Sequence, residues 1–301
     1  MITNPAPRPP PPDARPALDA RGELDIAPLA PFGAQVTGID LAAPWSDAVG
    51  DAFREAFVAH ALLVVRRQSL TKARMGEFAA LFGDVEGNVF RKPDGTTMEP
   101  IHEISNLDAQ GRPAENPYLK SNYHWHTDKA YLPVPALLTM LLAVELPRSG
   151  GDTEFADMSA AYEALPEVTR REIEGLRVVH SFEYMRTSTG DRPLTPEERA
   201  ATPPVEHPLV RTHPDTGRRS LYLGMYCSHV VGKNPDEGRA LLDRLLAHAT
   251  QARFVYTHRW QPGDLVFWDN RCLLHRAIPN YAMGSSRRVL NRLVVKGTSP
   301  Q

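Results

Sequence analysis

Apolar residues recur at helical spacing in several segments of the chain. In the segment 48–61, Phe53 and Phe57 fall on one face of the expected helix. The segment 235–251 carries a stripe of leucines, and Asn234 precedes it as an expected cap with proline in the first turn. The same spacing predicts helices at 71–82, 158–165 and 167–175. Helices are therefore expected, but over a minority of the chain.

Short runs of β-branched and other apolar residues, separated by turn residues, are more numerous than the helical segments. The pattern predicts strands at 34–41, 62–67, 100–104, 136–146, 153–155, 176–182, 208–212, 220–223, 254–260, 264–268, 272–275 and 288–296. No internal repeat is visible in the sequence. Many short strands with a few helices indicate a mainly β protein with flanking helices (α+β), built as a sandwich or a barrel.

The chain has 301 residues, of which 42% are hydrophobic, so it can bury a sizeable core in one large domain. Residues 1–20 are rich in proline and offer little to a core, so we expect a disordered arm there. A single domain is expected over 21–301. Two polar stretches that contain proline, 90–118 and 188–204, are predicted to be lids over a ligand site.

Composition limits the partners that this chain can have. The formal net charge of −2 and the isoelectric point near 6.6 provide no basic field, which argues against nucleic acid as a partner. The two cysteines, Cys227 and Cys272, exclude a disulfide framework and fit a reducing cytoplasm. No apolar run approaches the roughly 18 residues of a membrane span. We expect a soluble, cytoplasmic protein without a membrane partner; whether it forms a homo-oligomer stays open.

The stretch around Trp125 contains the first candidate for metal chemistry. His126 and Asp128 are two residues apart, and on a strand this spacing directs both side chains to the same face. A histidine and a carboxylate are two members of the 2-His-1-carboxylate set that binds non-heme Fe(II). A distant histidine would complete the set, and His275 follows a β-rich run 147 residues after Asp128.

Near the end of the chain, Arg288 and Arg292 are four residues apart on an expected strand. Both guanidinium groups would therefore point to the same side. Two arginines among apolar residues are costly to bury unless anions pair with them. Because guanidinium binds carboxylates through parallel hydrogen bonds, this pair is a candidate receptor for small acidic molecules.

These segments resemble the taurine dioxygenase and 2,4-dichlorophenoxyacetate dioxygenase family of Fe(II)/2-oxoglutarate-dependent oxygenases. The stretch 125–128 (WHTD) resembles the family's first ligand motif, and 150–153 (GGDT) resembles its co-substrate turn. The stretch 268–271 (WDNR), which leads to His275, resembles the second ligand motif, and 288–292 resembles the anion-binding strand. The similarity extends from about Phe32 to Lys296 and is strongest to the phenoxyacetate-degrading branch.

The resemblance implies a double-stranded β-helix (jelly roll) with the metal at its open end. It implies that His126, Asp128 and His275 bind Fe(II), and that 2-oxoglutarate and O2 are co-substrates. The distal carboxylate of 2-oxoglutarate would meet Arg288 and Thr153. Two further residues would contact the substrate. Arg292 would bind its anionic group, and Asn122 would line the pocket. The substrate would be a small carboxylate or sulfonate, such as an aryloxyalkanoate or a taurine-like compound.

Several alternatives stay open at the level of the sequence. His124 creates a His-x-His-x-Asp pattern, so it is a competing ligand, and Arg287 is a second candidate for the co-substrate carboxylate. The same three ligands could also hold zinc in a hydrolase, or the jelly roll could bind metal without catalysis. Lys120, Lys129 and Tyr131 are near the first motif, and the sequence does not decide whether they contact a substrate.

Overall fold

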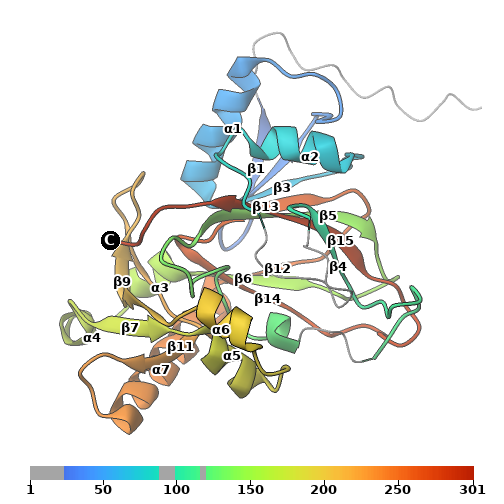
Figure 1. Cartoon of the computed structure of the whole chain (residues 1–301). Coiled ribbons are helices and arrows are strands. Elements are labelled where there is room, and N and C mark those ends of the chain that lie inside the picture. Colours follow the sequence, from blue (N-terminus) through green and yellow to red (C-terminus); the bar gives the residue numbers. More distant parts are fainter. Residues whose placement is uncertain (1–23, 88–98, 116–119) are drawn as a thin grey trace, which may run out of the picture.

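The structure is a computed structural model that describes residues 24–87, 99–115 and 120–301. The predicted arm at 1–20 lies outside these residues, and so do parts of the first predicted lid. The described chain forms two main β layers with helices on their outer faces (Figure 1).

The largest layer is a seven-stranded sheet in the order β1-β2-β3-β13-β5-β15-β4. The bounds of its strands are Asp25–Pro28 (β1), Ala34–Thr37 (β2), Leu62–Val65 (β3), His102–Ser105 (β4), Ala136–Glu145 (β5), Leu265–Asp269 (β13) and Val289–Lys296 (β15). Only β2 and β3 pair in parallel; the other neighbours in this sheet are antiparallel. In the part β3-β13-β5-β15-β4, strands from the first half of the chain therefore alternate with strands from the second half.

A smaller antiparallel sheet, in the order β12-β6-β14, forms the facing layer. Its strands are Val255–His258 (β12), Thr153–Asp157 (β6) and Leu273–Ala277 (β14). Phe155 and Leu273 from this sheet pack in one buried cluster with Val64, Val266 and Leu290 from the large sheet. The core between the layers is therefore apolar, as a sandwich requires.

Strand β3 is apolar at every position because both of its faces are buried. Leu62 and Val64 face the small sheet, whereas Leu63 and Val65 face the helices α1 (Asp47–His60) and α2 (Lys72–Ala79). Phe267 of β13 lies at the centre of this second core. Its ring lies 5.5–6.4 Å from four other phenylalanine rings: Phe53, Phe57, Phe78 and Phe82.

The outer side of the small sheet carries most of the stretch 158–254 (Figure 1). Three helices lie there: α3 (Met158–Glu163), α4 (Glu167–Ile173) and α7 (Pro235–Ala249). A three-stranded sheet joins β11 (Cys227–Val230), β7 (Arg177–His180) and β8 (Val205–Pro208), and β9 (Val210–Thr212) pairs with β10 (Arg219–Leu221). Two short helices, α5 (Phe182–Thr189) and α6 (Pro196–Ala201), complete this end.

Most predicted elements are present, including the helix at 235–251, whose Asn234 side chain caps α7 as expected. The predicted strand at 34–41 was too long, because β2 ends at Thr37. Helices α5 and α6 were missed, since their short polar segments lack a long apolar stripe. The sequence did contain a signal: Thr195 and Glu198 form a capping box at the start of α6. Strand β11 was also missed.

The helices of the described residues give no sign of a membrane span, since none combines the necessary length and apolarity.

The aromatic cluster around Phe267 predicts a large loss of stability when that ring is removed. Phe267 is fully buried, so Phe267→Ala should lower the free energy of unfolding by about 3–5 kcal/mol through lost contacts and a cavity. Val144→Ala on β5 is the control, because that side chain is 50% exposed and should cost less than about 0.5 kcal/mol. Urea unfolding measures both; similar losses for the two variants would contradict this account of the core.

Candidate metal centre and anion pocket

His126 and His275 are brought together by their own backbones. The N–H of each donates to the carbonyl of the other, at 3.0 and 2.8 Å, in an isolated antiparallel bridge. The expected strand around His126 is not present. The segment follows a 3₁₀ helix at Lys120–Tyr123 and is otherwise irregular. The pairing with β14, rather than a strand at 126–128, orients the first histidine.

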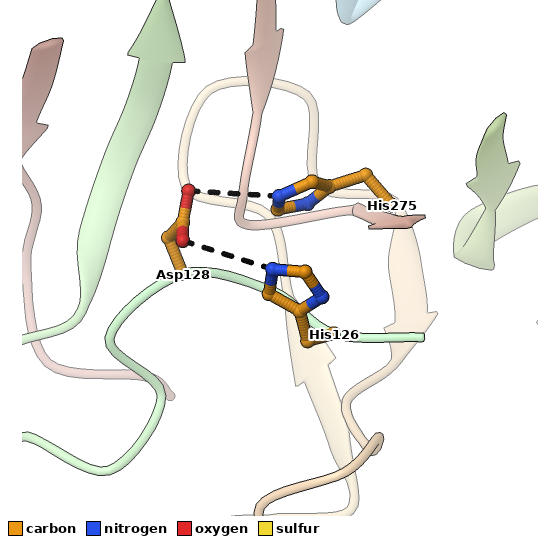
Figure 2. Close-up of side chains that lie close together, drawn as sticks. All are labelled: His126, Asp128 and His275. Atoms are coloured by element: carbon orange, nitrogen blue, oxygen red, sulfur yellow. Dashed lines mark ion pairs between the residues drawn. The ribbon is translucent and has the colours of Figure 1, made fainter. Parts of the chain in front are cut away.

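Asp128 lies between the two imidazoles (Figure 2). Its carboxylate oxygens lie 4.0 Å from His126 Nε2 and 3.7 Å from His275 Nε2. One donor atom from each of the three residues lies within 4.8 Å of the others, and all three side chains are buried. The structure therefore brings together the three residues that the sequence marked as ligands.

The protonation states suit metal binding. Burial lowers the pKa of both histidines, so their imidazoles are neutral. His126 Nδ1 lies 2.7 Å from the carbonyl oxygen of His124, which fixes the proton on Nδ1 and leaves a lone pair on Nε2. Burial opposes ionisation of Asp128, but the positive charge of Arg292 and the hydrogen bond from Thr139 favour the carboxylate, and its pKa lies below the usual range.

Asn270 and Thr139 hold Asp128 in place, and the sequence reasoning assigned neither a role. Asn270 Oδ1 accepts the Asp128 N–H at 3.1 Å and the indole N–H of Trp268 at 3.2 Å. Thr139 donates its hydroxyl to the Asp128 carboxylate and accepts from the Asn270 amide at 3.0 Å. The position of Asn270 directly after β13 was the available signal. Two neutral nitrogens and one oriented carboxylate fit a divalent transition metal.

The turn before β6 encloses the side chain of Arg288 beside this centre. Arg288 donates from Nε to the Gly151 carbonyl at 2.8 Å, and its Nη2 lies 3.4 Å from the Thr153 hydroxyl. Gly151 has a φ of +72°, and a Cβ there would lie 3.0 Å from Arg288 Cδ. Only glycine meets both conditions, because it tolerates this φ and leaves room for the arginine. Arg288 is 7% exposed.

Arg292 approaches the metal centre from β15. Its Nη2 lies 2.7 Å from Asp128 Oδ1, so it neutralises the carboxylate between the histidines. Arg292, Arg288, Thr153 and Asn122 line one cavity of about 380 Å³ together with the three candidate ligands. The three candidate ligands and the four residues that the resemblance assigned to co-substrate or substrate therefore share one space.

Three aromatic side chains, Tyr131, Phe182 and Tyr226, form one side of this cavity, called here the aromatic wall. Their ring centroids are 4.5, 5.0 and 6.4 Å apart, and all three rings are buried. Phe182 lies on α5, a helix that the sequence did not predict. Tyr131 was noted from the sequence as a residue near the metal motif, whereas the other two were not.

The competing residues are placed elsewhere. His124 is exposed, and only its carbonyl reaches His126. Arg287 is exposed and pairs with Glu145, so it does not reach the cavity. Lys129 does line the cavity, and its ammonium pairs with Glu86 at 2.9 Å. Lys120 is exposed and lies outside the cavity lining.

A second cluster of potential ligands, His213, Asp269 and Cys272, has its donor atoms occupied. Asp269 accepts from His213 Nε2 at 3.0 Å and from the Arg271 guanidinium at 2.6–3.1 Å. His213 Nδ1 accepts two backbone N–H groups of the turn at 215–216, so Nε2 carries the proton. Burial raises the pKa of the Cys272 thiol well above its usual range. This cluster is an ion-pair network, not a metal site.

Known proteins with similar sequences and structures are enzymes. The family model described as taurine catabolism dioxygenase TauD, TfdA family matches residues 25–294. An alpha-ketoglutarate-dependent 2,4-dichlorophenoxyacetate dioxygenase of Cupriavidus pinatubonensis is 42% identical over 274 residues, covering 88% of this chain and 95% of that protein. A (S)-phenoxypropionate/alpha-ketoglutarate-dioxygenase of Sphingobium herbicidovorans is 39% identical over 273 residues, covering 85% and 90%.

Among solved structures, AAD-2 in complex with Mn(II) and N-oxalylglycine superposes with a TM-score of 0.82. It is 38% identical, and the match covers 92% of this chain and 98% of that one. The fold of these proteins is the jelly roll, so the predicted fold class, mainly β with flanking helices, is confirmed.

The Asp269 network predicts a pH-dependent contribution to stability. Burial opposes ionisation of Asp269, but hydrogen bonds from His213 and Arg271 outweigh it and lower its pKa to about 2. Because the folded-state pKa is below the unfolded value near 3.9, the charge stabilises the fold above about pH 4. This contribution, about 2 kcal/mol, is lost as the pH falls through 2.

Asp269→Asn should therefore lower the free energy of unfolding at pH 7 by about 3–5 kcal/mol, since it leaves Arg271 without its buried partner. The difference from the unchanged protein should shrink between pH 5 and pH 3. Asp243→Asn is the control, because that exposed carboxylate on α7 pairs with Arg239 at the surface. Urea titrations at several pH values measure this, and a constant difference would contradict the assignment.

Proposed function

The chain belongs to the taurine catabolism dioxygenase TauD, TfdA family, and on this premise we propose that it hydroxylates a small aromatic carboxylate, with aryloxyalkanoates as the preferred class. It is an alpha-ketoglutarate-dependent dioxygenase, with Fe(II) as cofactor and 2-oxoglutarate and O2 as co-substrates. This assignment does not favour a zinc hydrolase or a non-catalytic jelly roll, the two alternatives left open by the sequence.

One observation carries the proposal: the cavity that contains the three candidate ligands is also lined by the guanidinium groups of both Arg288 and Arg292. His126, Asp128 and His275 would hold Fe(II), which activates O2 for oxidation of a C–H bond when it is bound. Arg288 and Thr153 would hold the distal carboxylate of 2-oxoglutarate, and Arg292 would hold the carboxylate of the substrate, with Asn122 beside it. A hydrolase has no use for a receptor for a second carboxylate.

Arg292 has two roles in this proposal. Without a metal it is the cation nearest to Asp128, at 2.7 Å. A divalent cation on Asp128 would take over part of this pairing and leave Arg292 able to meet an incoming carboxylate. Binding of the metal would thus prepare the pocket for an anionic substrate.

The aromatic wall favours an aryl group over a short aminoalkyl chain. Tyr131, Phe182 and Tyr226 present apolar faces on which a substrate ring can pack. Compounds such as phenoxyacetate combine a ring with a carboxylate one ether link away. The predicted lids, 90–118 and 188–204, would cover this cavity, since the described part of the first, 99–115, and the second both contribute residues to the lining.

The overall reaction conserves all atoms: substrate C–H, 2-oxoglutarate and O2 give substrate C–OH, succinate and CO2. With an aryloxyacetate, the hydroxylated carbon is a hemiacetal, which collapses to a phenol and glyoxylate. The protein's part is to orient the two acids and to keep water from the reacting carbon. Trp268 and Phe155 would support this, because they pack beside His275 within the core.

The experiment that tests this function is a stoichiometric assay of succinate with phenoxyacetate and with taurine. We expect succinate release with phenoxyacetate, and its loss in His126→Ala, Asp128→Ala and His275→Ala, because iron is held poorly without any one ligand. His124→Ala is a matched control that keeps the carbonyl contact to His126 and should stay active. If His124→Ala were inactive and Asp128→Ala active, the ligand assignment would be wrong.

The two arginines should separate in steady-state kinetics. Arg288→Gln should raise the KM for 2-oxoglutarate, because a lost bidentate contact to a carboxylate is worth about 2–4 kcal/mol, or roughly 30- to 1,000-fold. Arg292→Gln should instead raise the KM for the aromatic acid. Fe(II) is kept saturating in both assays, since Arg292 also contacts Asp128. Equal effects of both variants on both KM values would contradict this division of roles.

A further inference from the structure

Arg186, on helix α5, places a buried cation on the cavity, and the proposed function does not use it. The residue is 6% exposed and lines the cavity. Its Nε has no hydrogen-bond partner in the part of the chain that the structure describes. A buried guanidinium N–H without an acceptor costs free energy, so its presence at a ligand cavity needs an explanation.

The protein neutralises this guanidinium only weakly. The nearest carboxylate is that of Asp191, whose Oδ2 lies 4.0 Å from Arg186 Nη1, beyond hydrogen-bonding distance. Asp191 already accepts from the Thr189 hydroxyl and from the Lys120 N–H, both at 3.2 Å. The ring of Phe182 lies 5.1 Å below the guanidinium and offers only a cation–π contact. None of these contacts satisfies the Nε–H.

The other cations of the cavity have partners that account for them. Lys129 pairs with Glu86 at 2.9 Å, and Arg192 forms two hydrogen bonds with Glu198. Arg288 and Arg292 are assigned to the carboxylates of co-substrate and substrate in the proposed function. Among the cations of the described lining, Arg186 therefore has neither a hydrogen-bonded carboxylate nor a ligand assigned by the proposed function.

The aromatic wall, Arg186 and Arg292 line the same cavity, and the Arg186 guanidinium lies 5.1 Å from the centre of the Phe182 ring. Burial is the main cause that raises the pKa of the Tyr131 and Tyr226 hydroxyls, and the charges of Arg292 and Arg186 both oppose that rise. Both rings are therefore within electrostatic reach of both arginines. A substrate ring that packs on this wall, with its side-chain carboxylate on Arg292, could present a further group to Arg186 beside Phe182.

Building on the proposed function, we propose that Arg186 determines specificity by binding a second anionic group at the ring end of the substrate. The substrate class is then an aryloxyalkanoate that also carries a carboxylate or sulfonate on its ring. A second anion accepts a hydrogen bond from the Nε–H and also balances the buried positive charge. A neutral acceptor can accept the hydrogen bond but does not balance the charge. Arg186 would thus hold the far end of a dianionic substrate, while Arg292 holds the end near the oxidised carbon.

The test compares four acids: phenoxyacetate, 3- and 4-carboxyphenoxyacetate, and 4-carbamoylphenoxyacetate as the neutral acceptor. For the unchanged enzyme, we expect at least one carboxy compound to have a kcat/KM roughly 10- to 100-fold above that of phenoxyacetate. The carbamoyl compound should fall between them. If phenoxyacetate equals or exceeds both dianions, or if the neutral amide matches the better dianion, the proposal is wrong.

Variants at the same position separate charge from packing. Arg186→Gln should raise the KM for the preferred dianion by roughly 10- to 100-fold and change the KM for phenoxyacetate less than about threefold. Arg186→Lys should restore part of the difference, because it keeps the charge but not the planar donor group. Arg199→Gln is the control: it removes an arginine of α6 that pairs with Glu183 at the surface, outside the cavity lining. An equal loss for both acids in Arg186→Gln would overturn the proposal.

Binding without turnover separates failure of this inference from failure of the proposed function. Calorimetry is carried out without O2 on the enzyme loaded with Fe(II) and 2-oxoglutarate. One outcome is that no acid is hydroxylated in the turnover assay, while in calorimetry the dianion binds more tightly than phenoxyacetate and Arg186→Gln removes that advantage. The proposed reaction then fails, and the role of Arg186 stands. If phenoxyacetate is hydroxylated and the dianions bind no better, the reaction stands and the role of Arg186 is refuted. If no acid binds, both are refuted.

Discussion

The reciprocal backbone hydrogen bonds between His126 and His275 are the constraint on which the site depends. They join an irregular segment of the first half of the chain to β14, near the end of the chain. Because residues directly opposite in such a bridge have close side chains, the two imidazoles lie on the same side. Asp128 follows two residues later, and Asn270 and Thr139 fix its carboxylate between the rings. The metal centre is thus positioned by backbone pairing and completed by side chains.

Charge is balanced around this centre by pairs that the fold, not the local sequence, brings together. Arg292 on β15 neutralises Asp128, and Glu86, which follows α2, neutralises Lys129 next to the metal motif. Arg288 is enclosed by the turn at Gly151, where a side chain would collide with it. Arg288 and Arg186 have no hydrogen-bonded carboxylate partner among the described residues, and the proposed anionic ligands would supply it. Buried positive charge that the protein does not fully balance is the physical basis of the proposed preference for acids.

Much of the architecture followed from the sequence, because apolar periodicity reports burial directly. The helices at 48–61 and 235–251 and the central strands appeared nearly where expected. The ligand residues were recognisable since their spacing and order resemble a known family. Segments that are polar and short were misjudged: α5 and α6 have too few apolar residues to produce a period, although a capping box marked the start of α6.

The sequence by itself determined the kind of protein: a mainly β fold of a known dioxygenase family, with a two-histidine, one-carboxylate set and a pair of arginines on one strand. Only the tertiary structure decided which of the similar residues take part. It excluded His124 and Arg287 by exposure, recruited Asn270 and Thr139 to hold Asp128, and placed Arg186 and the aromatic wall on the cavity. These choices depend on contacts between residues far apart in the chain. Local pattern records whether a side chain is buried, but not which distant side chain it meets.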